Sequence, residues 1–363
     1  MTHRVGIIGV GWGAIVHAPA YQLVDDYEVV AICGRNPERL AAGAARAGIT
    51  DTSDDWESFV QRDDIDVISI STPVPAHHPM TLAALAAGKH VLCEKPLALS
   101  PQQCAEMVDA AAASGKATAT CFELRWTPER STVRKLVGEG LVGDPYYVRL
   151  TQSLGVWHPT HKNQALWMYD IDEGGGYLMG LVAHDIDFVS SLFGRPVQVC
   201  ADVRTAVPTR PLPDGSTLHV TADDTSALIL RLDSGAMAVL TASAVGVHAY
   251  GAVFDAFGTN GTISGPIGSR AGASTIRAAR ASDDGLQDVT VDDRLPRSGR
   301  PLPQRSAAGP IRAMALMLED WLPALDGGAT PVPIPSLADG MLVQAVIAAA
   351  RESAAGAGWV AIP

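Results

Sequence analysis

The 363-residue sequence contains no apolar run as long as the ~18 residues of a membrane span, so we expect no membrane partner. Its first residues enter an apolar strand directly, without the apolar segment of a signal peptide. Cysteine is scarce: the chain has five, which is an odd number. They also lack the spacing of a metal site. These absences predict a cytoplasmic protein with reduced thiols and no metal centre.

Positive charge is also in short supply. The chain has 27 Lys and Arg residues against 39 Asp and Glu residues, a net charge of −12. This balance argues against nucleic acid or an anionic membrane surface as the partner. The hydrophobic content of 47% indicates a large core, and 363 residues are many for one domain, so we expect two.

The first chemical motif is the glycine-rich stretch Gly9-Val10-Gly11-Trp12-Gly13-Ala14. It follows a predicted strand at 5–9 and precedes a helical stretch that runs towards Val24, which Pro19 should kink or shorten. Strand, turn and helix in this order are typical of a dinucleotide-binding turn, where the glycines let the pyrophosphate approach the backbone. We expect the cofactor to contact Gly9, Gly11, Trp12, Gly13 and Ala14.

The second predicted strand, 28–33, ends without the acid that an NAD site offers to the ribose 2′-hydroxyl. Instead Gly34 leaves room, while Arg35 and Arg39 supply cations that suit a 2′-phosphate. The sequence therefore predicts that NADP(H) is preferred, with NAD(H) as the alternative. The other interpretation of Arg35 is a solvated residue at the start of a helix.

Two further strands bring polar groups to the same predicted sheet edge. The strand at 67–70 ends in Ser71-Thr72-Pro73, whose hydroxyls suit the cofactor's ribose or nicotinamide amide, and the strand at 91–93 ends in Glu94-Lys95-Pro96. Ligands of open α/β sheets lie at the carboxyl ends of the strands, so we expect Lys95 beside the cofactor, held extended by Pro96. The alternation of strands and helices predicts a parallel-sheet Rossmann domain over 1–123.

The second half has the pattern of an α+β domain for substrate binding and oligomerisation over 124–363, with the alternative that its C-terminal helix packs back on the first domain. Its predicted strands are joined by short turns with few helices, which indicates a large, mostly antiparallel sheet. They lie at 146–154, 197–207, 225–232, 237–247, 252–257 and 275–279. Residues 293–309, rich in Arg, Pro and Ser, are expected to be a mobile loop or lid and not a domain boundary. Helices at 311–325 and 337–354 close the chain.

A second chemical stretch begins with Glu173-Gly174-Gly175-Gly176, whose glycines permit close approach of a ligand or of the other domain. A helix to about Leu192 should follow, and its spacing puts Tyr177, Gly180 and His184 on one face. Before it, an insertion made of residues 157–162 and 165–170, which include Trp157, His158 and Trp167, offers aromatic faces and hydrogen-bonding groups. These suit a sugar or cyclitol, or alternatively an arm that contacts another subunit.

Together, several of these motifs resemble the glucose–fructose oxidoreductase / inositol dehydrogenase / rhizopine-catabolism (Gfo/Idh/MocA) family. The motifs are the glycine turn, Ser71-Thr72-Pro73 with His77, the segment 88–96 and Arg125. The resemblance implies an NAD(P)-dependent oxidoreductase whose second domain carries an open sheet that commonly forms a homodimer or homotetramer interface. It also implies that His77, Glu94 and Arg125 lie in the cofactor site.

The resemblance assigns the acid–base chemistry to Lys95, which orients the carbinol oxygen, and to His184, which exchanges its proton. We therefore expect hydride transfer between nicotinamide and a secondary alcohol or ketone of a sugar, deoxysugar or cyclitol. The predicted substrate contacts are Lys95, Trp157, His158, Trp167, Tyr177 and His184. Two alternatives remain, a cofactor-binding regulator without turnover and a glycosidase that uses tightly held NAD.

Gly180 departs from the family pattern, which has an aspartate four residues before the histidine. The glycine either leaves space for a bulkier substrate or marks the loss of an acid that no longer has a proton to move. We favour space.

Overall fold

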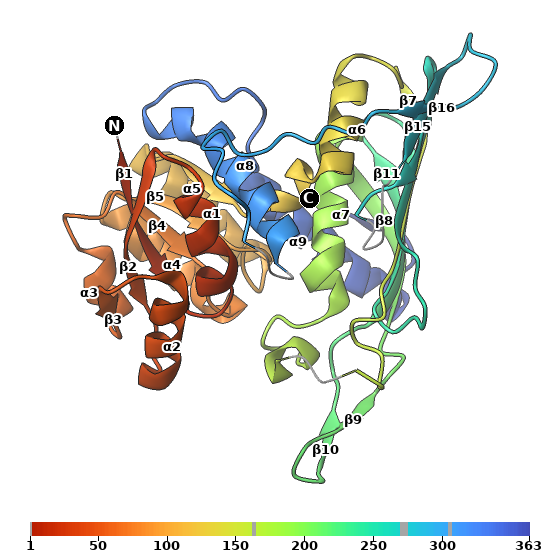
Figure 1. Cartoon of the computed structure of the whole chain (residues 1–363). Coiled ribbons are helices and arrows are strands. Elements are labelled where there is room, and N and C mark those ends of the chain that lie inside the picture. The colour runs from red at the N-terminus through yellow and green to blue at the C-terminus, as the bar shows by residue number, and fades with distance from the viewer. Residues whose placement is uncertain (1, 162–164, 269–274, 304–306) are drawn as a thin grey trace. The chain divides into compact units, whose positions relative to one another are not determined.

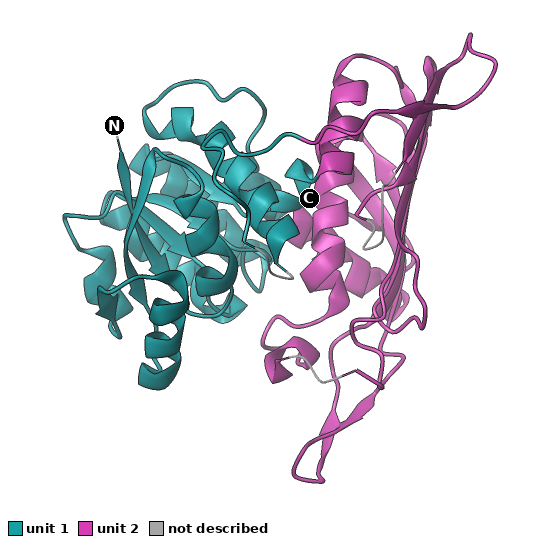
Figure 2. Cartoon of the chain, in the orientation of Figure 1, with its two compact units in different colours: residues 1–127, 294–342 teal, residues 128–293, 343–363 magenta. Residues whose placement is uncertain are grey.

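The computed structural model describes residues 2–161, 165–268, 275–303 and 307–363 (Figure 1). The chain forms two compact units, each built from two segments (Figure 2). Unit 1 comprises residues 1–127 and 294–342, and unit 2 comprises residues 128–293 and 343–363. Among the described residues, no helix is both long enough and apolar enough to cross a bilayer.

In the described part of unit 1, six strands form a parallel sheet in the order β3-β2-β1-β4-β5-β6. The strands are β1 (His3–Ile8), β2 (Tyr27–Cys33), β3 (Thr52–Ser53), β4 (Val67–Ile70), β5 (His90–Cys93) and β6 (Thr118–Thr120). The helices that alternate with them are α2 (Pro37–Ala47), α3 (Trp56–Val60), α4 (His77–Ala86) and α5 (Pro101–Ser114). This arrangement confirms the predicted Rossmann fold.

A late segment of the chain completes unit 1. Helix α8 (Ala308–Leu325) buries Met314, Leu318 and Trp321 in one core with residues of β1 and α1 (Ala18–Gln22). Residues 294–342 therefore pack with unit 1, whereas the sequence had placed them in the second domain and had allowed only the C-terminal helix to pack on the first. The unit boundary falls at 293/294, inside the segment predicted not to contain one, and Arg300 pairs there with Asp25 at 2.5 Å.

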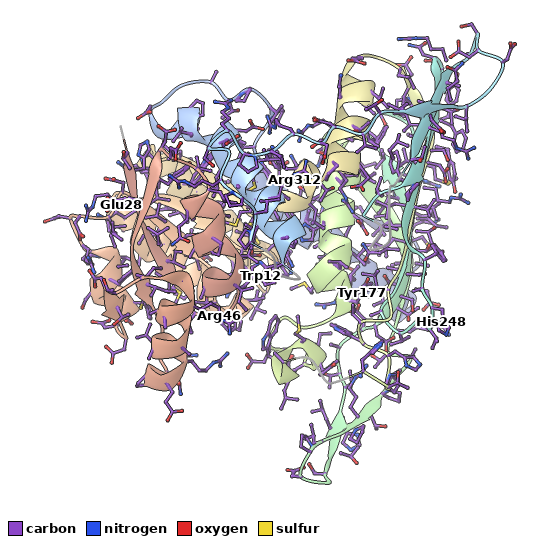
Figure 3. All side chains as sticks on the ribbon, in the orientation of Figure 1. Trp12, Glu28, Arg46, Tyr177, His248 and Arg312 are labelled. Atoms are coloured by element: carbon purple, nitrogen blue, oxygen red, sulfur yellow. The ribbon has the colours of Figure 1, made fainter. Side chains whose placement is uncertain are left out.

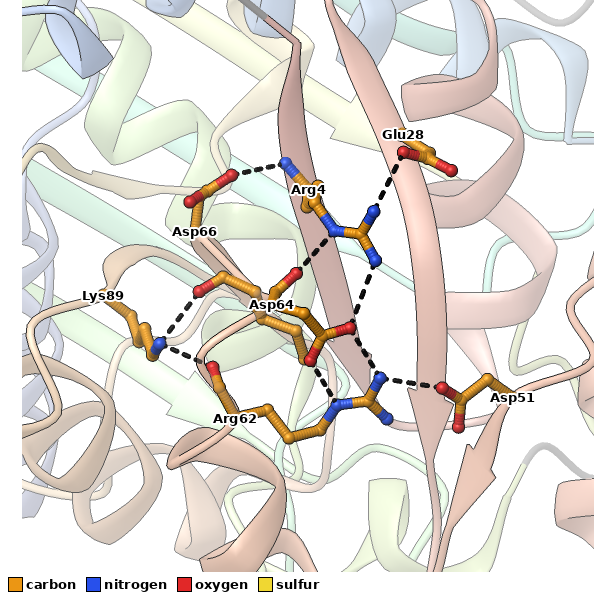
Figure 4. Close-up of polar contacts among 8 residues, drawn as sticks. Arg4, Glu28, Asp51, Arg62, Asp64, Asp66 and Lys89 are labelled. Carbon is orange, nitrogen blue, oxygen red and sulfur yellow. Dashed lines mark hydrogen bonds and ion pairs between the residues drawn. The ribbon is translucent and has the colours of Figure 1, made fainter.

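Charged side chains tie together the segments near the amino-terminal ends of the unit 1 strands (Figure 4). The Arg62 guanidinium donates to the Asp64 carboxylate at 2.9 and 2.8 Å, and this contact holds the pKa of Asp64 well below its usual range. Arg4 donates to the Asp64 carbonyl at 2.7 Å, and Lys89 Nζ donates to the carbonyls of Arg62 and Ile65. This network lies at the edge opposite to the predicted cofactor side.

The described part of unit 2 contains a nine-stranded sheet in the order β16-β15-β14-β13-β7-β12-β11-β8-β17. Its pairs are antiparallel except β7 with β12, which confirms the predicted α+β architecture. The strands are β7 (Pro145–Ser153), β8 (Pro196–Arg204), β11 (Thr225–Leu232), β12 (Met237–Ser243), β13 (Gly251–Gly258), β14 (Gly261–Pro266), β15 (Ile276–Arg280), β16 (Gln287–Val289) and β17 (Val360–Ala361).

Helices cover one face of this sheet. Helix α6 (Pro128–Gly138) and helix α7 (Ala183–Phe193) pack on it, and Phe188 of α7 meets Phe254 of β13 at 5.9 Å between ring centroids. Along β11, buried and exposed residues alternate, as a strand with one covered face requires. A hairpin of β9 (Thr209–Pro211) and β10 (Thr217–His219) stands apart from the sheet, and α9 (Leu337–Glu352) runs from unit 1 into unit 2.

Candidate active site

The glycine turn follows β1 and leads into a π-helix, η1 (Gly13–His17), and then the short α1, which has Pro19 in its first turn. A Cβ on Gly9, where φ is +120°, would overlap the Ser71 carbonyl, and one on Gly13 would lie 2.9 Å from the Ile7 side chain. A Cβ on Gly11 would meet nothing within 4 Å. The chain's own packing therefore requires Gly9 and Gly13, whereas the open space at Gly11 fits the approach of a dinucleotide phosphate.

The neighbours of this turn have separate roles. Trp12 is 41% exposed at the tip (Figure 3), and Ala14 is fully buried. Ser71 is buried against the glycines, and its Oγ has no hydrogen-bond partner among the described residues. Its Oγ would lie 3.2 and 3.1 Å from a Cβ on Gly9 and on Gly13, so this buried hydroxyl is at the glycine turn and fits a polar ligand there.

The end of β2 presents two cations. The side chains of Arg35 and Arg39 are exposed, and neither guanidinium bonds to any residue that the structure describes. Asn36 caps α2 by accepting a hydrogen bond from the Arg39 backbone N–H at 2.9 Å. A Cβ on Gly34 would lie 2.6 Å from Val10 Cγ1, so the chain's own packing favours glycine there, and the contact of Gly34 with a cofactor stays a prediction.

His77 joins two of the predicted cofactor loops. The buried ring has Nδ1 at 2.9 Å from the Pro96 carbonyl and Nε2 at 2.9 Å from the Thr72 carbonyl. Burial lowers the pKa of His77, although both carbonyls oppose the shift. A neutral ring donates to one carbonyl at a time, so His77 spans the loops after β4 and β5. Contacts of His77, Thr72 and Pro73 with a cofactor stay predictions.

Glu94 and Lys95 lie at the carboxyl end of β5 in a buried hydrogen-bonded chain. Glu94 Oε2 accepts the Lys95 backbone N–H at 3.0 Å, and Oε1 lies 3.0 Å from His17 Nε2. His17 Nδ1 in turn lies 2.8 Å from Ser69 Oγ. Burial raises the pKa of Glu94, but the His17 hydrogen bond and charge and the Lys95 charge outweigh it, so the pKa is lowered. Glu94 is therefore a carboxylate that orients Lys95, and the Lys95–Pro96 peptide is cis.

The same cluster contains Cys121 and Glu123, which follow β6. The nearest ligand-type atoms of His17, Glu94 and Cys121 lie within 4.8 Å of one another. Both ring nitrogens of His17 are already hydrogen-bonded, so we interpret the group as a hydrogen-bonded network and not as metal ligands. The expected absence of a metal stays a prediction. Sequence reasoning missed His17 and Glu123 because their partners are distant in the chain.

Arg125 lies just beyond this cluster, in η3 (Glu123–Trp126). Its side chain is 95% buried, and Nη2 lies 3.3 Å from Asp339 Oδ1. Asp339 also accepts the Ser336 backbone N–H at 2.7 Å, near the start of α9. The structure thus anchors Arg125 within unit 1, and its contact with a cofactor stays a prediction.

In unit 2, the glycine loop at 174–176 packs closely against other residues of the same unit. A Cβ on Gly175 would lie 2.6 Å from the carbonyl oxygens of Trp167, Met168 and Asp170. Gly176 has a φ of +112°, and a Cβ there would overlap the Asp223 carboxylate. The packing of unit 2 therefore itself requires these two glycines, and the close approach of a ligand or of the other domain stays a prediction.

The helix after this loop is not a continuous α-helix. Its first part is a π-helix, η5 (Leu178–Val182), and α7 begins at Ala183. The three-and-four spacing that grouped Tyr177, Gly180 and His184 applies to an α-helix, so that argument was wrong. A Cβ on Gly180 would meet nothing within 4 Å, so the chain itself does not require glycine at this position.

His184 is 3% exposed, and a buried ion pair fixes its backbone. Arg130 of α6 donates from Nη1 to the His184 carbonyl at 3.2 Å and from Nη2 to Asp185 Oδ1 at 2.5 Å. Its guanidinium also lies 4.8 Å from the centroid of the Phe188 ring. Burial raises the pKa of Asp185, with Arg130 opposing the shift. Sequence reasoning missed Arg130, which holds the first turn of α7 in place.

The predicted aromatic substrate contacts divide into two kinds. Trp157 and Tyr177 are buried, with ring centroids 5.8 Å apart, and Trp157 also meets Tyr169 at 5.3 Å (Figure 3 shows Tyr177). Buried Arg210 lies 4.4 Å from the Tyr169 ring and donates to the Trp157 carbonyl at 2.5 Å. Trp157 thus belongs to a packed cluster and is not an open platform.

The remaining two, His158 and Trp167, are half-buried. Together with His161 and His248, His158 lines a cavity of about 610 Å³ in unit 2. Lys162, from the same insertion, lies outside the described residues. The structure keeps His158 and Trp167 available to a ligand, and their substrate role stays a prediction.

Comparison with known proteins identifies the class. Residues 3–122 match the model of an oxidoreductase family with an NAD-binding Rossmann fold, and residues 131–264 match the GFO/IDH/MocA C-terminal domain. The chain is an NAD(P)-dependent dehydrogenase or reductase acting on CH–OH groups. It belongs to the Gfo/Idh/MocA oxidoreductase family.

Several relatives align over most of their length. Levoglucosan dehydrogenase of Pseudarthrobacter phenanthrenivorans is 30% identical over 99% of this chain and 98% of its own. Myo-inositol 2-dehydrogenase of Thermotoga maritima is 26% identical over 72% and 74% of the two chains. A solved structure of levoglucosan dehydrogenase with NADH and L-sorbose superposes with a TM-score of 0.86, at 27% identity over the whole of both chains. These names do not favour the regulator or glycosidase alternatives.

Proposed function

We propose that this enzyme transfers a hydride between the nicotinamide of NADP(H) and a secondary alcohol or ketone carbon of a sugar, deoxysugar or cyclitol. The observation that carries the proposal is the Ser69–His17–Glu94 chain, which fixes the backbone of Lys95 at the carboxyl end of β5. Ligands of open α/β sheets lie at this edge.

The cofactor, when bound, supplies or accepts the hydride. The turn at Gly11 and the hydroxyl of Ser71 would hold its phosphate and ribose groups, while Arg35 and Arg39 would bind a 2′-phosphate. Their exposed, unpartnered guanidinium groups support a preference for NADP(H) over NAD(H).

In the substrate step, Lys95 Nζ would hold the reacting oxygen by a hydrogen bond, and His184 would take up or return its proton. The ion pair of Arg130 with Asp185 would keep His184 in one orientation by fixing the turn that carries it. His158 and Trp167 would contact the sugar.

The relatives narrow the substrate class. By name they include a levoglucosan dehydrogenase, a myo-inositol 2-dehydrogenase and a D-glucoside 3-dehydrogenase. We therefore infer a ring-shaped polyol with a free secondary hydroxyl. The test is to incubate the purified protein with NADP⁺ or NAD⁺ and a panel of anhydrosugars, glucosides and inositols, and to follow nicotinamide absorbance. Reduction with at least one member is expected, and cleavage of a glucoside without net reduction would overturn the proposal.

We further infer a homodimer or homotetramer formed through the uncovered sheet face of unit 2. Ile229, Met237 and Phe257 are 37–44% exposed, and the burial pattern of their strands puts them on the face away from α7. Light scattering on the purified protein tests this assembly, and a monomer at micromolar concentration would contradict it.

A further inference from the structure

His161 lines the cavity of about 610 Å³ in unit 2 together with His158, and the mechanism above gives it no task. The two imidazole rings lie edge to face, with their centroids 6.1 Å apart. His158 is half-buried and His161 is exposed, so a ligand can reach both rings. Apolar side chains form much of the remaining wall, namely those of Leu154, Val156, Val247 and Ala249. Small-molecule sites of about 300–1,000 Å³ typically combine such walls with a few polar groups.

The hydrogen bonds of each ring determine which of its nitrogens carries the proton. The Gly155 carbonyl can only accept, so His161 Nδ1 donates to it at 2.5 Å, and Nε2 of the neutral ring is an acceptor. The Thr160 backbone N–H donates to His158 Nδ1 at 3.3 Å, so this ring carries its proton on Nε2. Neither Nε2 atom bonds to a residue that the structure describes. The pair therefore offers a ligand one donor and one acceptor.

The loop that carries this pair is held by its own backbone. The Gly155 carbonyl also accepts the His158 N–H at 3.0 Å, and the His158 carbonyl accepts the His161 N–H at 2.9 Å. A Cβ on Gly155 would lie 2.5 Å from the Gly246 carbonyl oxygen, so glycine lets this loop pack against the chain that follows β12. The donor and the acceptor are thus positioned before a ligand arrives.

The same cavity has a third imidazole, that of His248 (Figure 3). This residue is exposed, and its φ of +54° lies in the left-handed region, which residues other than glycine adopt rarely. Residues in such conformations cluster at active sites and ligand sites. The backbone at His248 is therefore a second, independent observation that favours a ligand in this cavity.

We propose that His158 and His161 are specificity-determining residues that together bind the substrate through hydroxyl groups away from its reacting carbon. His158 Nε2–H donates to a ring hydroxyl, and the same hydroxyl or its neighbour donates to His161 Nε2. Such hydrogen bonds are about 2.8 Å long, which suits imidazole rings at this separation. This inference rests on the proposed function, because it takes the ligand to be the sugar or cyclitol substrate.

The contact between Trp157 and Tyr177 joins this loop to the segment that leads to His184. Trp157 directly precedes His158, and its ring lies 5.8 Å from that of Tyr177, the residue before η5. A metal ion is the other common ligand of paired histidines, but it needs an unprotonated nitrogen from each ring. His158 Nε2 carries a proton, so the pair suits a hydroxyl better than a metal ion.

The kinetic test uses the sugar that the panel identifies. His158→Phe and His161→Phe keep the shape of the ring and lose its nitrogens. Each should raise KM about tenfold and leave kcat within a few-fold of wild type, because the lost hydrogen bond is equally strong in the ground state and the transition state. His219→Phe, at an exposed position of β10, should change neither quantity. An unchanged KM in both variants would overturn the proposal.

Monodeoxy analogues of the same sugar identify the hydroxyl. In wild type, at least one analogue that lacks a hydroxyl away from the reacting carbon should show a KM raised about tenfold. His158→Phe and His161→Phe should no longer distinguish this analogue from the parent sugar, since the two changes remove the same interaction. If every analogue is disfavoured as strongly in the variants as in wild type, the proposal is wrong.

Nitrogen NMR of histidine-labelled protein with bound NADP⁺ examines the site without turnover. The two Nε2 signals are assigned by their loss in His158→Phe and His161→Phe. Levoglucosan, methyl glucoside and myo-inositol, one from each class of the panel, are added singly, and at least one should shift both signals. No shift with any of them, or binding of micromolar Zn²⁺ to both Nε2 atoms, would contradict the proposal.

Failure of this inference differs from failure of the proposed function. If no member of the panel reduces the cofactor but one shifts both Nε2 signals, the proposed function fails and the hydroxyl site stands. If a sugar is oxidised with the wild-type KM in both variants, the hydroxyl site fails and the proposed function stands.

Discussion

At the scale of single residues, the choice of cofactor depends on Arg35 and Arg39. We expect NADPH to bind more tightly than NADH, because exposed guanidinium groups form charge-assisted hydrogen bonds with a phosphate. Arg35→Ala should reduce the difference in binding free energy between NADPH and NADH by about 1–3 kcal/mol. Binding is followed through the fluorescence of exposed Trp12, with Arg46→Ala, which changes an exposed cation in the last turn of α2, as control (Figure 3). Equal dissociation constants of the two cofactors for wild type would refute the preference.

Gly180 is the residue at which the enzyme departs from the family pattern. Because a side chain here meets nothing of the chain itself, Gly180→Ala should leave the protein equally stable or stabilise it by about 0.4–1 kcal/mol. Under the space hypothesis, Gly180→Asp should reduce turnover by crowding the substrate. Thermal unfolding and turnover are measured for both variants. A severalfold rise in turnover of Gly180→Asp would show instead that the site lacks an acid.

The glycines of the chain differ in how far the sequence predicts their role. The turn at Gly9, Gly11 and Gly13 was predictable because strand, turn and helix adjoin in the chain. The packing that favours glycine at positions 34 and 175 was not predictable, since the atoms that an added Cβ would meet come from residues 5 to 24 positions away. His17 and Glu123 were missed for a similar reason, because His17 contacts Glu94, and Glu123 comes under its electrostatic influence, only once the strands are paired.

At the scale of elements, the helical segments that carry His17 and His184 both begin as π-helices, η1 and η5. Wide turns of this kind occur often at functional sites. The strands that were predicted lie within a few residues of their observed positions, since alternation and turn residues mark them locally, whereas β14 and the short strands β3, β16 and β17 were not predicted. The two π-helices were not predicted, because a five-residue segment is too short to produce a recognisable period in the hydrophobic pattern.

The junction of α6 and α7 depends on one buried ion pair. Arg130→Leu leaves the Asp185 carboxylate buried without its partner, so the free energy of unfolding should fall by about 3–5 kcal/mol. Arg204→Ala, which breaks an exposed pair with Asp202, should change the free energy of unfolding far less, because solvent screens that pair. Urea unfolding at neutral pH measures both. Equal losses for the two variants would contradict the role given to Arg130.

At the scale of the whole molecule, Glu123 links stability to pH. Its folded pKa of about 8 lies above the ordinary 4.5, so the folded state holds a proton that the unfolded state releases. The proton bound to Glu123 makes its full contribution to the free energy of unfolding below pH 4.5, and this contribution is lost as the pH rises through about 8. Between these values the free energy of unfolding should fall more steeply with pH in wild type than in Glu123→Gln. Identical slopes in chemical denaturation would contradict the assignment.

The division of the chain into units was only partly predictable. The two fold classes follow from the order of strands and helices, but the membership of residues 294–342 does not. Helix α8 buries mainly apolar side chains, and the sequence pattern of these side chains does not specify which of the two sheets the helix covers. Tertiary packing with β1 and α1 decides that question.

The central claim is that Lys95 acts on the substrate oxygen, and one comparison tests it directly. Lys95→Ala, assayed with the identified sugar, should lower kcat by about 10²–10⁴-fold, the usual effect of losing an acid–base group. The dissociation constant for NADPH should stay within a few-fold of wild type, and Lys135→Ala, at an exposed position of α6, should change neither quantity. A kcat for Lys95→Ala within a few-fold of wild type would contradict the account.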